Sequence, residues 1–145
     1  MNLIDSVKRV LANNFALYLK AHYYHWNVEG PDFSQFHTFF GNFYESVYES
    51  VDKFAEEIRA LDAYAPGSFE RYIQLSDIKG DDRVPRPLDM VQQLMVDNNL
   101  MIGSLKEAYQ LAEEGGALGL ANFIQDRIDV HSKWGWMLKS FNKAI

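Results

Sequence analysis

The sequence contains no cysteine and no long apolar segment. Without cysteine the chain cannot form disulfides, thiolate zinc sites or iron–sulfur clusters, so any metal must bind to histidine and carboxylate. No apolar run approaches the ~20 residues that cross a bilayer. Lys8 and Arg9 are followed by mixed polar residues and by no small-residue cleavage site, so we do not expect a signal peptide. The expected location is the cytosol.

Positive charge is also scarce. The 14 Lys and Arg residues are outnumbered by 20 Asp and Glu residues, which gives a formal net charge of -6. This balance argues against nonspecific binding to nucleic-acid phosphates and suits a protein that handles cations. The 145 residues, 48% hydrophobic and 23% charged, have the size and composition of one globular domain spanning 1–145.

Glycine and proline are few, and they separate long segments with helical periodicity. Apolar residues recur every three or four positions over residues 3–28, which predicts a helix that ends before Gly30 and Pro31. The same reasoning predicts four further helices, the second of them short, at 33–62, 69–75, 88–114 and 118–142. Four long helices with one long connection between the second and third indicate an all-α, ferritin-like four-helix bundle with a short helix in that crossover.

Two histidines and two carboxylates are the candidate metal ligands. His25 and His37 each lie six residues from Pro31, so a hairpin of the first two helices brings them to the same height. Asp52 and Glu56 are one turn apart on the second helix and share one face. Imidazole nitrogen with carboxylate oxygen suits iron, manganese or zinc, and open positions on iron can bind an oxidant.

The spacing prevents these four residues from meeting within one chain. His37 and Asp52 are 15 residues apart on one predicted helix, about 22 Å at ~1.5 Å per residue, whereas metal–ligand bonds are about 2 Å. If two copies pack antiparallel about a two-fold axis near residue 46, His37 of one chain meets Asp52 and Glu56 of the other. Singly, such residues are more often a solvated helix face or a core histidine, and only their joint arrangement favours a metal site.

The four candidate ligands lie among further segments that match the sequence pattern of a known family. They are His22-Tyr23-Tyr24-His25-Trp26-Asn27-Val28-Glu29-Gly30-Pro31-Asp32-Phe33, His37, the segment 52–61, Ala65-Pro66-Gly67-Ser68, Asp126-Arg127-Ile128, His131 and Trp136-Met137-Leu138. Together they resemble the Dps family, the DNA-protection-during-starvation mini-ferritins. The resemblance implies a hollow dodecameric shell, ferroxidase sites at its two-fold interfaces, hydrogen peroxide as the preferred oxidant and a ferric mineral stored inside.

Residue roles follow from the same resemblance. It implies that His25 and His37 bind iron from one subunit and that Asp52 and Glu56 bind it from the partner subunit, with Glu56 the ligand most able to bridge two irons. Trp26 resembles an aromatic residue of the family that donates an electron and intercepts radicals, although packing at the interface explains it equally well.

The chain departs from the family pattern at Gly41. Many members carry an acidic residue there, one turn after His37, and glycine has no side chain to replace it. The second iron position is therefore in doubt. Water can fill the gap left by the missing side chain. A glycine inside a helix costs about 1 kcal/mol relative to alanine, and close packing across the two-fold axis is the alternative explanation for it.

The charged residues of the chain ends and of the last helix bear on DNA binding and iron entry. Members that coat DNA often use a flexible basic tail, whereas here the C-terminus offers only Lys139 and Lys143, so weak or no DNA binding is expected. Iron enters such shells through acidic three-fold pores, for which Asp126 and Asp129 are candidates, although a solvated helix face is the more ordinary explanation.

Three functions remain open from the sequence. The leading one is a ferroxidase and iron-storage shell. The second is a nucleoid-coating DNA-binding protein with a secondary metal site. The third is a structural shell that binds zinc or a single iron and turns over poorly.

Overall fold

The computed structural model describes residues 1–142, which form helices and loops without any strand in that range. The elements are α1 (Leu3–Asn27), α2 (Phe33–Tyr48), α3 (Val51–Ala60), α4 (Phe69–Leu75), α5 (Pro87–Glu114) and α6 (Leu118–Ser140). The expected all-α fold with a short helix in the long connection is confirmed. Lys143 and the two residues after it, the end of the expected domain, lie outside the described residues.

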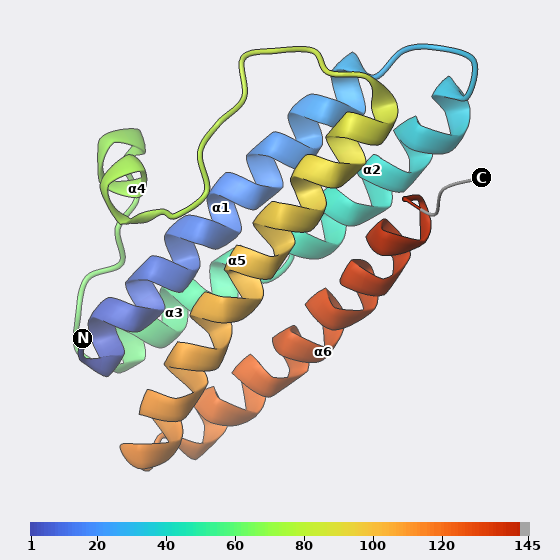
Figure 1. The fold of residues 1–145 in the computed structure, drawn as a ribbon. Coiled ribbons are helices and arrows are strands. Elements are labelled where there is room, and N and C mark those ends of the chain that lie inside the picture. The colour runs from blue at the N-terminus through green and yellow to red at the C-terminus, as the bar shows by residue number, and fades with distance from the viewer. Residues whose placement is uncertain (143–145) are drawn as a thin grey trace.

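Four long rods lie side by side in the bundle: α1, the α2–α3 pair, α5 and α6 (Figure 1). The connection between α3 and α5 carries α4 and returns along the length of the bundle, so α2–α3 and α5 run in the same direction. α1 packs against α2 and α5, and α5 packs against α6. One long crossover in a four-helix bundle is the ferritin-like connectivity expected from the sequence.

Helix ends follow local chemistry. The Asn2 side chain accepts a hydrogen bond from the Asp5 backbone at 2.8 Å and caps α1. Gly30 has φ 123°, a value that favours glycine, at the turn between α1 and α2. This turn places the last residues of α1 beside the first two turns of α2.

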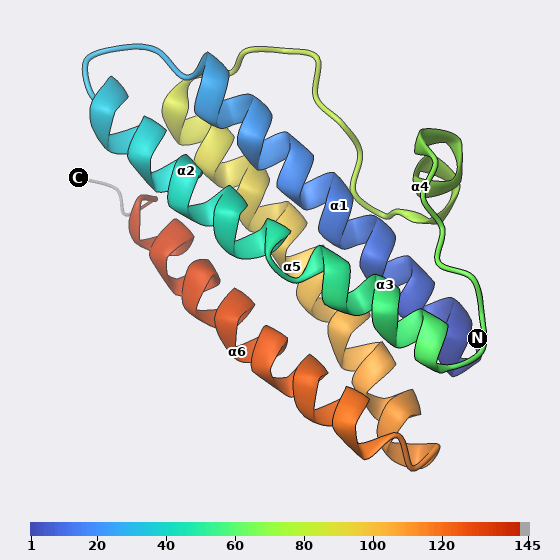
Figure 2. The same cartoon turned by 180° about the vertical axis from the view of Figure 1, so that it is seen from behind.

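The single helix expected over 33–62 is wrong, because the helix is interrupted at Glu49 and Ser50. The buried Ser50 hydroxyl donates to the Val47 carbonyl at 3.0 Å and accepts from Asn14 Nδ2 at 3.0 Å. A serine that bonds a carbonyl one turn back competes with the helical ladder and bends the helix. Figure 2 shows α3 continuing α2 in nearly the same direction, so the two segments still extend along the bundle end to end.

Besides Asn14 and Ser50, the apolar core encloses two further pairs of buried polar residues. Lys20 Nζ and an Asp97 carboxylate oxygen are 2.7 Å apart, and burial raises the pKa of Asp97 while the ammonium opposes that rise. His131 Nδ1 and Asn98 Oδ1 are 2.8 Å apart, and burial, with repulsion by Arg127, lowers the pKa of His131 to about 3. His131 is therefore neutral at physiological pH.

In the part of the chain that the structure describes, no helix is both long enough and apolar enough to span a membrane.

Candidate metal centre

His25 and His37 meet at the corner between α1 and α2. His25 lies in the last turn of α1, and His37 lies in the second turn of α2. Their rings stack with centroids 3.8 Å apart and planes 17° from parallel, and Phe33 stacks on His37 at 5.0 Å. The prediction that a hairpin brings the two histidines together is confirmed.

Each of these rings is held by the backbone of the other histidine. His25 Nδ1 is 2.7 Å from the His37 carbonyl oxygen, and His37 Nδ1 is 2.7 Å from the His25 carbonyl oxygen. Because a carbonyl oxygen only accepts, both Nδ1 atoms donate in these bonds, which leaves Nε2 as the nitrogen of each ring that can bind a metal ion. Metal-binding histidines are oriented by this kind of bond, which fixes the tautomer and strengthens the ligand.

Gly41 lies directly against His25. A Cβ atom at position 41 would stand 3.0 Å from His25 Cε1 and 3.1 Å from His25 Nδ1. Any larger residue there must push the imidazole aside, and an acidic side chain would do so too. A contact within one chain thus explains the glycine, so the alternative of packing across a two-fold axis is not needed.

Asp52 and Glu56 stand apart from the histidine pair. Both are exposed on α3, beyond the break that separates it from α2. Among residues 1–142 no three His, Asp or Glu side chains come together closely enough to hold a metal ion. One chain thus assembles the two imidazoles and leaves the two carboxylates at another place on its surface.

Three aromatic residues beside the histidine pair were missed in the sequence analysis as site residues. His22 stacks on Tyr44 with centroids 3.8 Å apart and planes 9° from parallel, and its Nδ1 is 3.0 Å from the Tyr18 hydroxyl. The pKa of His22 is lowered by burial and by neighbouring His25. The spacing of residues 18, 22 and 25, about one helical turn from each to the next, was the signal available in the sequence.

The remaining candidates lie on the surface. Trp26 packs on His22 with ring centroids 3.9 Å apart, and 58% of it is exposed. Asp126 and Asp129 are exposed on α6, and neither forms an ion pair within residues 1–142.

Comparison with known proteins gives the family. The Ferritin-like domain model matches residues 4–145. An uncharacterized low temperature-induced protein of Nostoc is 34% identical over 143 residues, which cover 96% of this chain and 79% of that protein. The DNA protection during starvation protein of Brevibacillus brevis is 29% identical, and the match covers 93% of this chain and 91% of that one.

A solved structure agrees with these relatives. The Dps protein of Vibrio cholerae, described as a member of a broad superfamily of ferritin-like diiron-carboxylate proteins, superposes with a TM-score of 0.93 and 28% sequence identity. The superposition covers 97% of this chain and 89% of that chain. The chain therefore belongs to the ferritin-like family and, within it, to the Dps mini-ferritins.

Proposed function

We propose that the protein is a ferroxidase and iron-storage shell whose substrate, ferrous iron, binds at sites shared between two subunits. Iron storage and ferroxidase chemistry are supported for the ferritin-like family at a general level. The observation that carries the proposal here is the reciprocal pair of 2.7 Å bonds, which leaves Nε2 of His25 and of His37 available as ligands. Two preset imidazoles form half of an iron site.

The other half comes from a second copy in this proposal. Asp52 and Glu56 are one turn apart and exposed on α3, where a partner can reach them. Antiparallel packing of two α2–α3 rods places His25 and His37 of one subunit beside Asp52 and Glu56 of the partner subunit, and each dimer gains two identical sites. Carboxylate oxygen then completes a mixed nitrogen and oxygen ligand set that suits iron.

An exposed apolar surface supports association with a second copy. Trp26 is 58% exposed, Phe69 70% and Ile73 78%, and all three line one cavity between α1 and the crossover. Large exposed apolar patches on a protein of this size mark interaction surfaces. Dimers of this kind build the proposed dodecameric shell. Asp126 and Asp129 line its proposed entry pores. The proposed location of the protein is the cytoplasm.

The proposed reaction uses hydrogen peroxide as oxidant. Two ferrous ions give one electron each, the O–O bond of peroxide breaks, and two protons complete two water molecules. His25, His37 and Asp52 hold the iron in this scheme, Glu56 bridges where two ions bind, and Trp26, which packs on His22, is the proposed aromatic electron donor. Ferric ions then form the mineral inside the shell.

The sharing of the site can be tested by complementation. His37→Ala and Asp52→Ala assemblies should each lose the fast ferric absorbance that follows addition of ferrous iron and peroxide in a stopped-flow instrument. In a mixed dimer of the two variants, one site carries both substitutions and the other carries neither, so co-refolded mixtures should regain activity. A Glu114→Ala variant, altered at the end of α5, serves as the control.

The complementation experiment has two opposing results. If the single variants oxidise iron as fast as the unaltered protein, the ferroxidase proposal is wrong. If both are inactive and the mixture stays inactive as well, the proposal that two subunits share the site is wrong.

The name of the Brevibacillus relative points to DNA protection as a second candidate. The net charge of -6 opposes a tight complex with DNA phosphates. We expect no gel shift at physiological salt, and a tight, salt-sensitive complex would favour the nucleoid-coating function. A shell that binds only zinc or one iron would instead show slow or absent ferric absorbance in the stopped-flow experiment.

A further inference from the structure

We infer that Arg127 is a positioning residue for the proposed iron site, because it fixes the angle between α2 and α3. The inference rests on the proposed ferroxidase function and adds to it a residue that lies outside the ligand set. Arg127 belongs to α6, and only 4% of it is exposed. Its guanidinium reaches the break between α2 and α3, where Nη1 lies 3.7 Å from a Glu49 carboxylate oxygen.

The break releases a backbone carbonyl that Arg127 holds. In a continuous α-helix the Ser50 amide would donate to the Ser46 carbonyl, four residues back. Here the Ser50 amide donates to the Val47 carbonyl instead, at 3.4 Å. Arg127 Nη2 donates to the Ser46 carbonyl at 2.8 Å, so a side chain of α6 replaces the helical donor. A hydrogen bond from a charged donor is roughly twice as strong as a neutral one.

Two neighbouring helices hold the break from different sides. From α1, Asn14 Nδ2 donates to the Ser50 hydroxyl at 3.0 Å. From α6, Trp134 Nε1 donates to the Ser46 hydroxyl at 2.9 Å, next to the carbonyl that Arg127 holds. These bonds reach residues on both sides of the break. The direction of α3 relative to α2 is therefore set by the helices that flank them.

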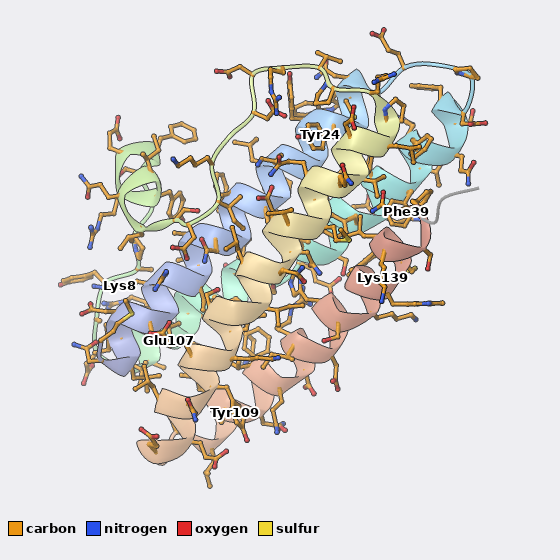
Figure 3. All side chains as sticks on the ribbon, in the orientation of Figure 1. Lys8, Tyr24, Phe39, Glu107, Tyr109 and Lys139 are labelled. Atoms are coloured by element: carbon orange, nitrogen blue, oxygen red, sulfur yellow. The ribbon has the colours of Figure 1, made fainter. Side chains whose placement is uncertain are left out.

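Aromatic packing supports the contact between α6 and α2. The Trp134 ring meets Phe43 edge to face with centroids 5.2 Å apart, and it meets Phe39 in the same way at 5.6 Å. Figure 3 shows Phe39 on α2 beside the C-terminal part of α6. α6 is thus packed along α2, and Arg127 extends this contact to the break.

The angle matters because the proposed ligands lie on both sides of the break. In the proposed antiparallel dimer, His37 of one subunit meets Asp52 and Glu56 of the partner subunit, and both sites must close at once. His37 lies about 14 Å from Ser46 at ~1.5 Å per residue, so a change of about 10° in the angle displaces a ligand by about 2 Å. Metal–ligand distances tolerate deviations of about 0.2 Å. A small change in the angle would therefore separate the histidines from the carboxylates.

Stability alone does not favour an arginine at this position. Burial lowers the pKa of Arg127, because the guanidinium is held away from water. Apolar side chains of similar volume often replace buried charged groups without loss of stability. A planar guanidinium, in contrast, can bond to a backbone carbonyl and face a carboxylate at the same time. The buried charge is therefore explained by the geometry that it maintains.

The experiment compares Arg127→Met with the matched control Lys139→Met. Both variants remove one positive charge from α6 and keep a long unbranched side chain, but Lys139 is exposed (Figure 3). Anaerobic calorimetry with ferrous iron on the assembled protein should give a Kd at least about tenfold weaker for Arg127→Met, as for other groups that orient metal ligands. Lys139→Met should keep the Kd of the unaltered protein.

Two further measurements separate positioning from a general effect on stability. A crystal structure of Arg127→Met should show a changed angle between α2 and α3 and an unchanged stack of His25 on His37. In an Asp52→Ala/Glu56→Ala background, Arg127→Met should not weaken the Kd for ferrous iron any further, because no carboxylate remains to be displaced.

The outcomes distinguish the role of Arg127 from the ferroxidase function. An unchanged Kd in Arg127→Met, or a weaker Kd with an unchanged angle, overturns the role of Arg127 and leaves the ferroxidase proposal intact. If Arg127→Met does not assemble, Arg127→Gln, which has a shorter reach, should show the same loss of affinity. Failure of both variants to assemble assigns the arginine to folding and overturns the positioning role. Absence of ferrous iron binding in the unaltered protein overturns the ferroxidase proposal and the role of Arg127 with it.

Discussion

The substitution Gly41→Ala isolates the role of the His25 ring position. The added Cβ stands 3.0 Å from His25 Cε1 and 3.1 Å from His25 Nδ1, so the imidazole must move by a few tenths of an ångström. The His25 ring has little room to move, because its centroid lies 3.8 Å from that of the His37 ring and its Nδ1 bonds to the His37 carbonyl oxygen at 2.7 Å. We expect the ring to tilt and this bond to lengthen or break.

The magnitudes of the two effects can be compared. Alanine in place of a helical glycine stabilises the helix by about 1 kcal/mol, and loss of one hydrogen bond costs about 0.5–1.5 kcal/mol. The free energy of unfolding should therefore change little. Iron affinity should change much more, because loss of a bond that orients a ligating histidine weakens metal binding by about 10–100-fold.

Anaerobic titration calorimetry with ferrous iron measures this effect on the assembled protein, and thermal unfolding measures stability in parallel. Gly103→Ala is the matched control, since Gly103 also lies inside a helix and its Cβ would meet no atom within 4 Å. It should raise Tm by about 2–4 °C and leave the iron Kd unchanged.

Unchanged iron affinity in Gly41→Ala, in protein that unfolds normally, would refute the reasoning from His25. Gly41→Asp provides a further check. It introduces the acidic residue that many family members carry, yet it should bind iron no better than Gly41→Ala, because its Cβ meets the same ring.

Three other predictions concern buried polar groups. Burial lowers the pKa of His131 to about 3, so as the pH falls the unfolded chain protonates this imidazole before the folded chain does. The free energy of unfolding should therefore decrease from about pH 6.5 towards pH 3, by at most about 1.4 kcal/mol per pH unit. Urea titrations of His131→Gln should show a smaller decrease over the same pH range. Lys20→Met leaves the Asp97 carboxylate buried alone and should cost about 3–5 kcal/mol, whereas the double variant Lys20→Met/Asp97→Leu should recover most of this in chemical denaturation. Ser50→Ala removes the acceptor of Asn14 Nδ2 and should cost about 1–3 kcal/mol, measured as a lower Tm.

The sequence was sufficient for features that depend on neighbours along the chain. Helical periodicity and the Gly30 turn predicted both the bundle and the meeting of His25 with His37, because the two residues flank one short corner. The shared iron site stays a prediction, since only one chain is described.

Features that depend on contacts between helices were not predictable in this way. At the helix break, the Ser50 hydroxyl that bonds to the Val47 carbonyl is also held by Asn14 on another helix, and periodicity does not reveal that contact. The stack of His22 on Tyr44 depends on how α1 is rotated against α2, and periodicity does not determine that rotation. The contact of Gly41 with His25 could not be predicted for the same reason. A glycine in a sequence indicates that space is needed, but not which group fills that space.

The local nature of the histidine corner has a consequence for newly synthesised chains. His25 and His37 are 12 residues apart, and Nδ1 of each ring bonds to the backbone carbonyl of the other histidine, so this half of the site can form as soon as the hairpin folds. Two imidazoles alone are a weak ligand set for ferrous iron, which also needs carboxylate oxygen. In the proposed scheme a lone subunit is therefore redox-silent, and oxidation begins only once two subunits have assembled.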